Sequence, residues 1–173
     1  MSRSNTAIAV AMSVLALASP LITGCTNPLA DNLFNSGVDK YEQGDYQGAI
    51  TDFTKVIEID PQSADAYHNR GTAKDDLEDY QGAIADYNKA VEINPQYVNA
   101  YYNRGVAKYH SRNYQGAIAD YTKVIEINPR FSSAYSIRGA SKYLLGDLKG
   151  ACDDARKAAD LGDKRSAEWI KQC

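Results

Sequence analysis

The sequence predicts an all-α fold, a right-handed α-solenoid of four helix-turn-helix repeats closed by a C-terminal capping helix. A 34-residue period is the first observation. It is carried by two columns of glycines, at Gly37, Gly71, Gly105 and Gly139 and at Gly48, Gly82, Gly116 and Gly150. Within each period apolar residues fall three and four apart, as on one face of a helix. Pro61, Pro95 and Pro129 share the period and end a helix in each of three repeats. A lone pair of such helices cannot bury both apolar faces, so neighbouring pairs must stack.

The four repeats span residues 30–63, 64–97, 98–131 and 132–165. The second and third repeats share 20 identical residues in 34 positions, far more than chance produces. The fourth repeat diverges, with Ala155 where the others have an aromatic residue, as terminal repeats often do. Residues 166–173 are expected to form the capping helix, in which Trp169 and Ile170 cover the last apolar face.

Residues 1–24 differ in composition from everything after them. Arg3 is their only charged residue, and the apolar run 7–17 is shorter than the ~20 residues of a membrane-spanning helix. This pattern predicts an export signal. The segment 21–25, Leu-Ile-Thr-Gly-Cys, resembles the lipobox of bacterial lipoproteins. The resemblance implies cleavage before Cys25, acylation of its sulfur and an extracytoplasmic, lipid-anchored protein of the cell membrane or outer membrane. The alternatives are an ordinary secretory signal or an uncleaved anchor.

Residues 25–29 would then form a short tether. Asn27 can cap a helix and Pro28 suits its first turn, so the first helix is expected to begin two or three residues after Cys25. Five extended residues reach about 17 Å. The first repeat is therefore expected to lie close to the membrane.

The 34-residue period and the residue types at its recurring positions resemble the tetratricopeptide repeat (TPR). The second repeat carries the family's positions at Tyr67, Gly71, Ala83, Tyr87, Ala90 and Pro95. The resemblance implies a scaffold without enzymatic activity, whose concave groove is lined by the first helix of each repeat and binds a peptide or helix of a partner protein. The predicted groove residues are Phe34, Asn35, Tyr41, His68, Asn69, Tyr102, Asn103, Tyr109 and Tyr143.

Tyrosine dominates this predicted groove. Of the chain's 13 tyrosines, eight fall on packing columns of the repeat, whereas four map to the groove: Tyr41, Tyr102, Tyr109 and Tyr143. Exposed aromatic residues are natural binding anchors. The groove asparagines could bond a partner's backbone or satisfy neighbouring groups, and the sequence does not decide between these roles. Phe34 and Asn99 stand where the family's carboxylate-clamp subgroup has lysines, which disfavours binding of acidic chaperone tails.

The net charge of the chain argues against nucleic-acid binding. The 19 basic and 22 acidic residues give a formal net charge of −3. Arg70, Arg104 and Arg138 form a column that could trap an anion. Each lies as far before its hairpin turn as Asp86, Asp120 and Asp154 lie after it. This symmetry favours structural ion pairs within each hairpin.

Two of the three cysteines, Cys152 and Cys173, are not explained by the predicted lipidation of Cys25. They lie about equally far on either side of the turn near Gly162, and the predicted export signal places them in an oxidising compartment. We therefore expect a disulfide that holds the cap; two free thiols are the alternative.

Catalytic patterns are not apparent. The two histidines, His68 and His110, belong to different repeats, and neither a short-spaced metal-ligand cluster nor a phosphate loop is recognisable. No catalytic residue, metal, cofactor or small-molecule substrate is therefore expected. Two other classes stay open: a tether for envelope assembly or secretion that uses its convex face or ends, and a small hydrolytic enzyme.

Overall fold

The structure is a computed structural model that describes residues 27–173. The predicted signal peptide (residues 1–24) and Cys25 lie outside the described residues. These described residues form nine α-helices, a short 3-10 helix and no strand. The helices are α1 (Pro28–Glu42), α2 (Tyr46–Ile59), α3 (Ala64–Asp76), α4 (Tyr80–Ile93), α5 (Val98–His110), α6 (Tyr114–Ile127), α7 (Ser132–Leu144), α8 (Leu148–Asp160) and α9 (Lys164–Trp169), followed by η1 (Ile170–Gln172).

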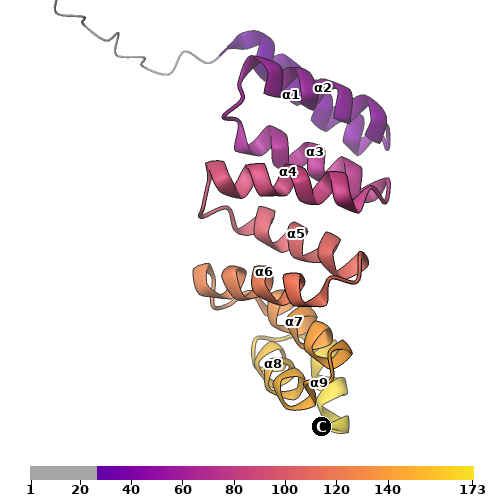
Figure 1. Ribbon diagram of the computed structural model, residues 1–173, viewed down its shortest axis with the longest axis vertical. Coiled ribbons are helices and arrows are strands. Elements are labelled where there is room, and N and C mark those ends of the chain that lie inside the picture. The colour runs from indigo at the N-terminus through magenta and orange to yellow at the C-terminus, as the bar shows by residue number, and fades with distance from the viewer. Residues whose placement is uncertain (1–26) are drawn as a thin grey trace, which may run out of the picture.

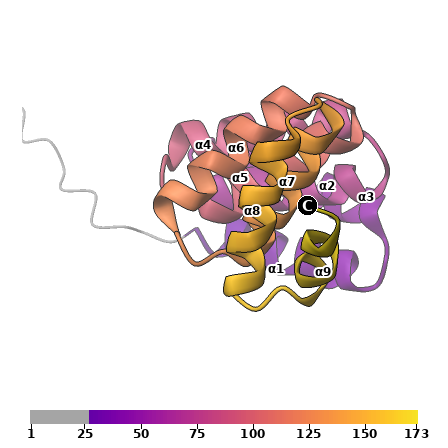
Figure 2. The same cartoon turned by 90° about the horizontal axis from the view of Figure 1, so that it is seen from below.

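The helices stack in chain order along one axis (Figure 1). Each hairpin, α1–α2 through α7–α8, packs mainly on itself and on the helix that follows or precedes it in sequence. Seen along the stack, the hairpins overlie one another with a progressive rotation (Figure 2). The prediction of an all-α solenoid is confirmed.

One of the two glycine columns serves helix capping. The second helix of each hairpin is capped by an Asp or Asn side chain that accepts the N–H of the glycine three residues on, as Asp45 does from Gly48 at 2.9 Å. A Cβ added to Gly48 would lie only 2.1 Å from the Asp45 carboxylate. Glycine at this place therefore lets the cap approach the helix closely.

The other glycine column receives an aromatic ring. Phe53, Tyr87 and Tyr121, all fully buried, point from the second helix of a hairpin toward the first. A Cβ added to Gly37 or Gly71 would lie about 2.8 to 3.0 Å from ring carbons of Phe53 or Tyr87. The ring and the missing side chain together set the distance between paired helices. Alanines fill most of the remaining core.

The tight turns inside the hairpins use left-handed backbone. The residue two before each second helix has φ between 62° and 84°, at Gly44, Glu78, Arg112 and Gly146. Two repeats thus place a side chain where glycine is the unstrained choice.

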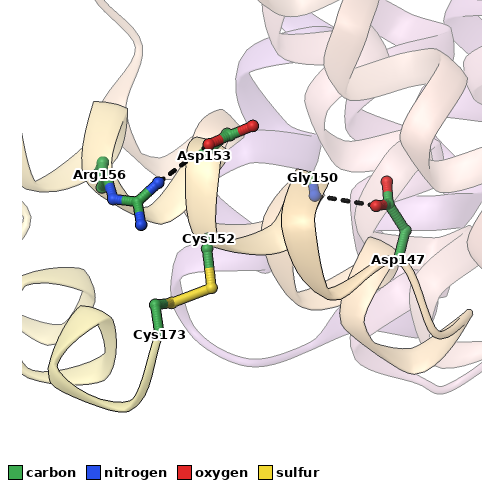
Figure 3. Close-up of a disulfide and its surroundings, with 6 residues drawn as sticks. All are labelled: Asp147, Gly150, Cys152, Asp153, Arg156 and Cys173. Atoms are coloured by element: carbon green, nitrogen blue, oxygen red, sulfur yellow. Dashed lines mark hydrogen bonds and ion pairs between the residues drawn. A yellow bond between two sulfur atoms is a disulfide. The ribbon is translucent and has the colours of Figure 1, made fainter.

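The cap begins two residues earlier than predicted, at Lys164, because Asp163 caps α9 by accepting the N–H groups of Arg165 and Ser166. The chain then turns back so that Cys173 forms a disulfide with Cys152 of α8, with 5.9 Å between their Cα atoms (Figure 3). The end of the chain is thereby fixed to the last hairpin.

Candidate partner-binding groove

The predicted groove residues come from α1, α3, α5 and α7, the first helices of the four hairpins. In the first repeat Phe34 packs edge-on against Phe53, with 5.6 Å between ring centroids, and Asn35 is exposed. Tyr41 packs on Tyr46, and its hydroxyl donates to Asp76 of the next repeat. Burial and the Asp76 carboxylate raise the pKa of Tyr41. These aromatic residues are half-buried against their own scaffold rather than fully exposed.

His68 lies at the junction of the second and third repeats. Its ring packs between Tyr87 and Tyr97, with centroids 5.8 and 5.0 Å away. Asn103 Nδ2 lies 3.1 Å from His68 Nε2, so this asparagine bonds a neighbouring repeat. Burial lowers the pKa of His68. Asn69, beside it on α3, is half-buried.

The third and fourth repeats contribute three of the predicted groove tyrosines: Tyr102, Tyr109 and Tyr143. The ring of Tyr102 packs against Tyr121 and Phe131, with centroids 5.8 and 5.0 Å away. Tyr109 packs on Tyr114 at 5.5 Å. Tyr143 is the most open of the predicted groove tyrosines, with 51% of its surface exposed.

Only two of the predicted groove residues line a common pocket. A pocket of about 550 Å³ lies between α5, α6, α7, α8 and the cap, and it brings Tyr109 and Tyr143 together. Trp169 of α9 also lines it and packs edge-on against Tyr143, with 5.8 Å between ring centroids. From the sequence Trp169 was expected only to cover the last apolar face, so its place in the pocket wall was not predicted. The other seven predicted groove residues do not line this pocket: Phe34, Asn35, Tyr41, His68, Asn69, Tyr102 and Asn103.

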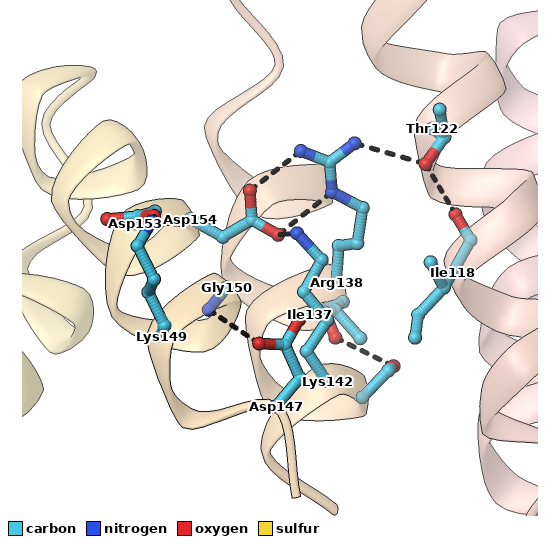
Figure 4. A network of polar contacts seen from close by, with 11 residues as sticks. Ile118, Thr122, Ile137, Arg138, Lys142, Asp147, Lys149, Gly150, Asp153 and Asp154 are labelled. Carbon is cyan, nitrogen blue, oxygen red and sulfur yellow. Dashed lines mark hydrogen bonds and ion pairs between the residues drawn. The ribbon is translucent and has the colours of Figure 1, made fainter. Parts of the chain in front are cut away.

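A repeated polar network lies between the two helices of each hairpin. In the fourth repeat the Arg138 guanidinium forms two hydrogen bonds to the Asp154 carboxylate, at 2.9 and 2.7 Å, and Lys142 Nζ lies 2.8 Å from it (Figure 4). Arg70 with Asp86 and Arg104 with Asp120 repeat the arrangement. The predicted ion pairs are confirmed, and they account for the arginine column without an anion ligand.

The same arginines also join neighbouring repeats. Arg138 Nη1 donates to Thr122 of the preceding repeat at 3.0 Å, and Arg70 and Arg104 donate to Thr54 and Asn88. These bonds between repeats were not predicted from the sequence. Each aspartate is at most 4% exposed, so each charge is held by paired and directional contacts rather than by water.

The first repeat makes its own version of the network. Asp52 accepts from Ser36 at 2.7 Å, where the other repeats have arginine, and from Lys40 at 2.5 Å. Burial would raise the pKa of Asp52, but hydrogen bonds from Lys40, Ser36 and Lys55 outweigh burial and lower it. The aspartate column is therefore common to all four repeats while its donors vary.

Two polar atoms stand apart from these networks. The Tyr121 hydroxyl and Asp75 Oδ1 are buried and have no hydrogen-bond partner among the described residues. Burial raises the pKa of Asp75, which the neighbouring His110 partly counters. Among residues 27–173 no group of three or more His, Cys, Asp or Glu side chains is placed to hold a metal ion. No helix in that range is both long and apolar enough to cross a membrane.

Family models match most of the repeat array. A model described as "TPR repeat" matches residues 37–74 and 76–111, and one described as "Tetratricopeptide repeat" matches residues 98–131. The chain belongs to the tetratricopeptide repeat family. A comparison with curated protein sequences found no match.

Solved TPR structures resemble this chain closely in shape. MamA is 28% identical with a TM-score of 0.76, and the match covers 82% of this chain and 83% of MamA. The first TPR of Spaghetti (RPAP3), bound to the HSP90 peptide SRMEEVD, is 30% identical with a TM-score of 0.68, covering 70% of this chain and 96% of that domain. The Arabidopsis OM64 TPR domain is 25% identical with a TM-score of 0.65, covering 67% and 96%. The fold is thus that of TPR interaction domains.

Proposed function

We propose that this TPR protein is a scaffold whose concave groove binds an extended peptide or a helix of a partner protein. The observation that carries the proposal is the pocket in which Tyr109 and Tyr143 meet Trp169, because aromatic side chains around a partly exposed hollow are typical anchors of protein interfaces. The RPAP3 domain, a relative of the same fold, is bound to a peptide. Catalysis is not part of the proposal.

The acidic tail seen with RPAP3 is not the proposed ligand here. Phe34 occupies one of the positions where the clamp subgroup has lysine, and it packs on Phe53. Asn99, at the other such position, is exposed and uncharged. The groove offers aromatic surface instead of paired cations, so we propose a partner segment with apolar anchors.

A peptide-display library selected against the full chain tests the groove. We expect selected peptides to bind the Tyr102→Ala/Tyr109→Ala double variant at least ~30-fold more weakly, because loss of even one central aromatic anchor costs about 2 kcal/mol or more. The matched control is Gln81→Ala/Gln115→Ala, which changes exposed residues on α4 and α6 and should leave binding unchanged. Equal dissociation constants for the tyrosine variant and the wild type, with equal melting temperatures, would reject the groove.

The membrane tether is a second part of the proposal. The lipobox-like segment supports it, and the helix start at Pro28, capped by Asn27, leaves little chain between Cys25 and the first repeat. Such a protein would offer its groove next to the membrane. Mass spectrometry of the chain produced in a bacterium tests this: an acylated N-terminal Cys25 supports the tether, and an unmodified or uncleaved N-terminus rejects it.

A further inference from the structure

The fourth repeat lacks the ring that the others place between their helices. Phe53, Tyr87 and Tyr121 each pack on a glycine of the preceding helix, and Ala155 takes their place in the fourth repeat. A Cβ added to Gly139 would meet the carbonyl oxygen of Ala151 at 3.1 Å, Asp154 Cβ at 3.3 Å and the Ala155 nitrogen at 3.8 Å, so none of its three nearest neighbours is a ring atom. The glycine that normally receives a ring is thus present without one.

The 550 Å³ pocket occupies this place. Gly139, Ala151 and Ala155 belong to its lining, so its floor is the surface that a ring covers in the other repeats. Tyr143 and Trp169 stand at its walls. Its volume lies in the range of ligand sites, and its lining is mostly apolar. The three other repeats show what chemistry fits a floor of this kind, namely an aromatic ring.

A buried hydroxyl in the same lining lacks a partner. Tyr121 lines the pocket, has no exposed surface, and its hydroxyl makes no hydrogen bond to any described residue. In the second repeat the corresponding Tyr87 hydroxyl donates to Thr72 Oγ1 at 3.2 Å. Val106 stands in the third repeat where Thr72 stands in the second, so the acceptor is lost. An unpaired buried hydroxyl lowers stability, and a ligand with a polar group would recover that loss.

We propose that this pocket is the specificity pocket of the groove and takes one aromatic side chain with a hydrogen-bonding group, a tyrosine or a tryptophan, from the partner. The inference rests on the proposed function, because Tyr109 and Tyr143 belong both to the groove and to the pocket. The ring packs on Gly139 as Phe53 packs on Gly37. Its phenol O–H or indole N–H donates to the Tyr121 oxygen, which neighbouring side chains cover in the free protein and uncover when the ring enters.

The rim of the pocket indicates what flanks that ring in the partner. Leu144 lines the pocket, Leu145 follows it in the turn, and Leu148 is the first residue of α8; all three are 47 to 59% exposed. Leu148 stands where the first three repeats have tyrosines. These exposed leucines, which begin at the pocket with Leu144, favour apolar residues next to the partner's aromatic anchor.

Small probes test the pocket without a known partner. Trp169 is the chain's only tryptophan and lines the pocket, so its fluorescence reports occupancy by N-acetyl-tyrosinamide, N-acetyl-phenylalaninamide or N-acetyl-leucinamide. We expect the tyrosine probe to bind several-fold more tightly than the phenylalanine probe, and the leucine probe to bind most weakly. In Tyr121→Phe the difference between the first two probes should vanish, because the hydroxyl that distinguishes them is gone.

A substitution that fills the pocket with a side chain of the protein itself provides the decisive test. Ala155→Phe supplies the missing ring and is expected to weaken the tyrosine probe at least ~10-fold while keeping or raising the melting temperature. Ala85→Phe, at an exposed site on α4, is the matched control and should bind as the wild type does. If Ala155→Phe fails to fold, Ala155→Leu fills the space more gently and carries the same expectation.

The outcomes separate the two proposals. Unchanged probe binding by a folded Ala155→Phe variant, or a leucine probe that binds as tightly as the tyrosine probe, overturns the specificity pocket. Display-selected peptides that lose affinity in Tyr102→Ala/Tyr109→Ala but not in Ala155→Phe overturn the pocket and leave the groove function standing.

Probe binding that Ala155→Phe abolishes, with no peptide selected, supports the aromatic site and rejects the groove function. Self-association that Ala155→Phe abolishes assigns the site to a second copy and overturns the partner proposal.

Discussion

At the scale of single residues, the hairpin turns show how one backbone shape accepts different side chains. Gly44 and Gly146 sit at φ of 81° and 84°, where glycine carries no steric penalty. Glu78 and Arg112 hold the equivalent places at φ 62°. The 34-residue period aligns these four positions, but the sequence could not reveal that they share a left-handed backbone, because two of them carry glutamate and arginine instead of glycine. The backbone conformation is what the four turns share.

Replacement of Glu78 by glycine should therefore stabilise the protein. A non-glycine residue in the left-handed region costs about 1 kcal/mol or more, and the exposed Glu78 side chain makes no hydrogen bond within the described residues that would be lost. We expect an increase of up to ~1 kcal/mol in the free energy of unfolding, measured by urea denaturation. The control Gln81→Gly, in α4, should lower it by a similar amount. A destabilised Glu78→Gly variant would contradict the assignment of strain to this turn.

At the scale of helices, the period made some contacts predictable and left others hidden. The pairing of Arg138 with Asp154 follows from their symmetric distances to the turn, and the structure contains it. The bond from Arg138 to Thr122 crosses between repeats, where spacing alone does not fix which residues face each other. The pocket was hidden for a different reason. Ala155 looks like ordinary divergence of a last repeat until the ring-on-glycine packing of the other repeats is visible.

The disulfide makes a prediction about the cap. Cys152 and Cys173 close a loop of 21 residues, for which a chain-entropy model gives a stabilisation of about 3 kcal/mol. We expect reduction to lower the melting temperature by several degrees. The Cys152→Ser/Cys173→Ser variant should already melt at this lower temperature and should not respond to reductant. Equal melting of the wild type with and without reductant would contradict a stabilising disulfide.

At the scale of the whole molecule, stability is distributed along the stack. Each helix packs mainly on its sequence neighbours, so the core is a row of similar interfaces rather than one centre. Both ends are exposed to fraying, but they are built differently. The end at α8 carries the cap and the disulfide, whereas α1 packs on α2 and on little else.

The rate of backbone amide hydrogen exchange should differ between the two ends of the stack in the same way. We expect hydrogen–deuterium exchange, followed by mass spectrometry, to show the least protection in α1 and α2 and the most in α4 to α6, because terminal repeats open at lower free energy than central ones. The α7–α8 hairpin should be intermediate when the disulfide is intact and should lose protection on reduction. Uniform protection from α1 to α8 would indicate a single cooperative unit instead.

The cross-repeat bonds of Arg70, Arg104 and Arg138 have a consequence for how such a gene can change. Each arginine meets a short polar side chain 16 positions earlier, so every junction uses interchangeable parts. Recombination that removed residues 64–97 would place Arg104 opposite Thr54, a pairing already used at other junctions. The array can therefore gain or lose an internal unit by unequal crossing-over with its junctions intact, while the pocket travels with the last two units and the cap.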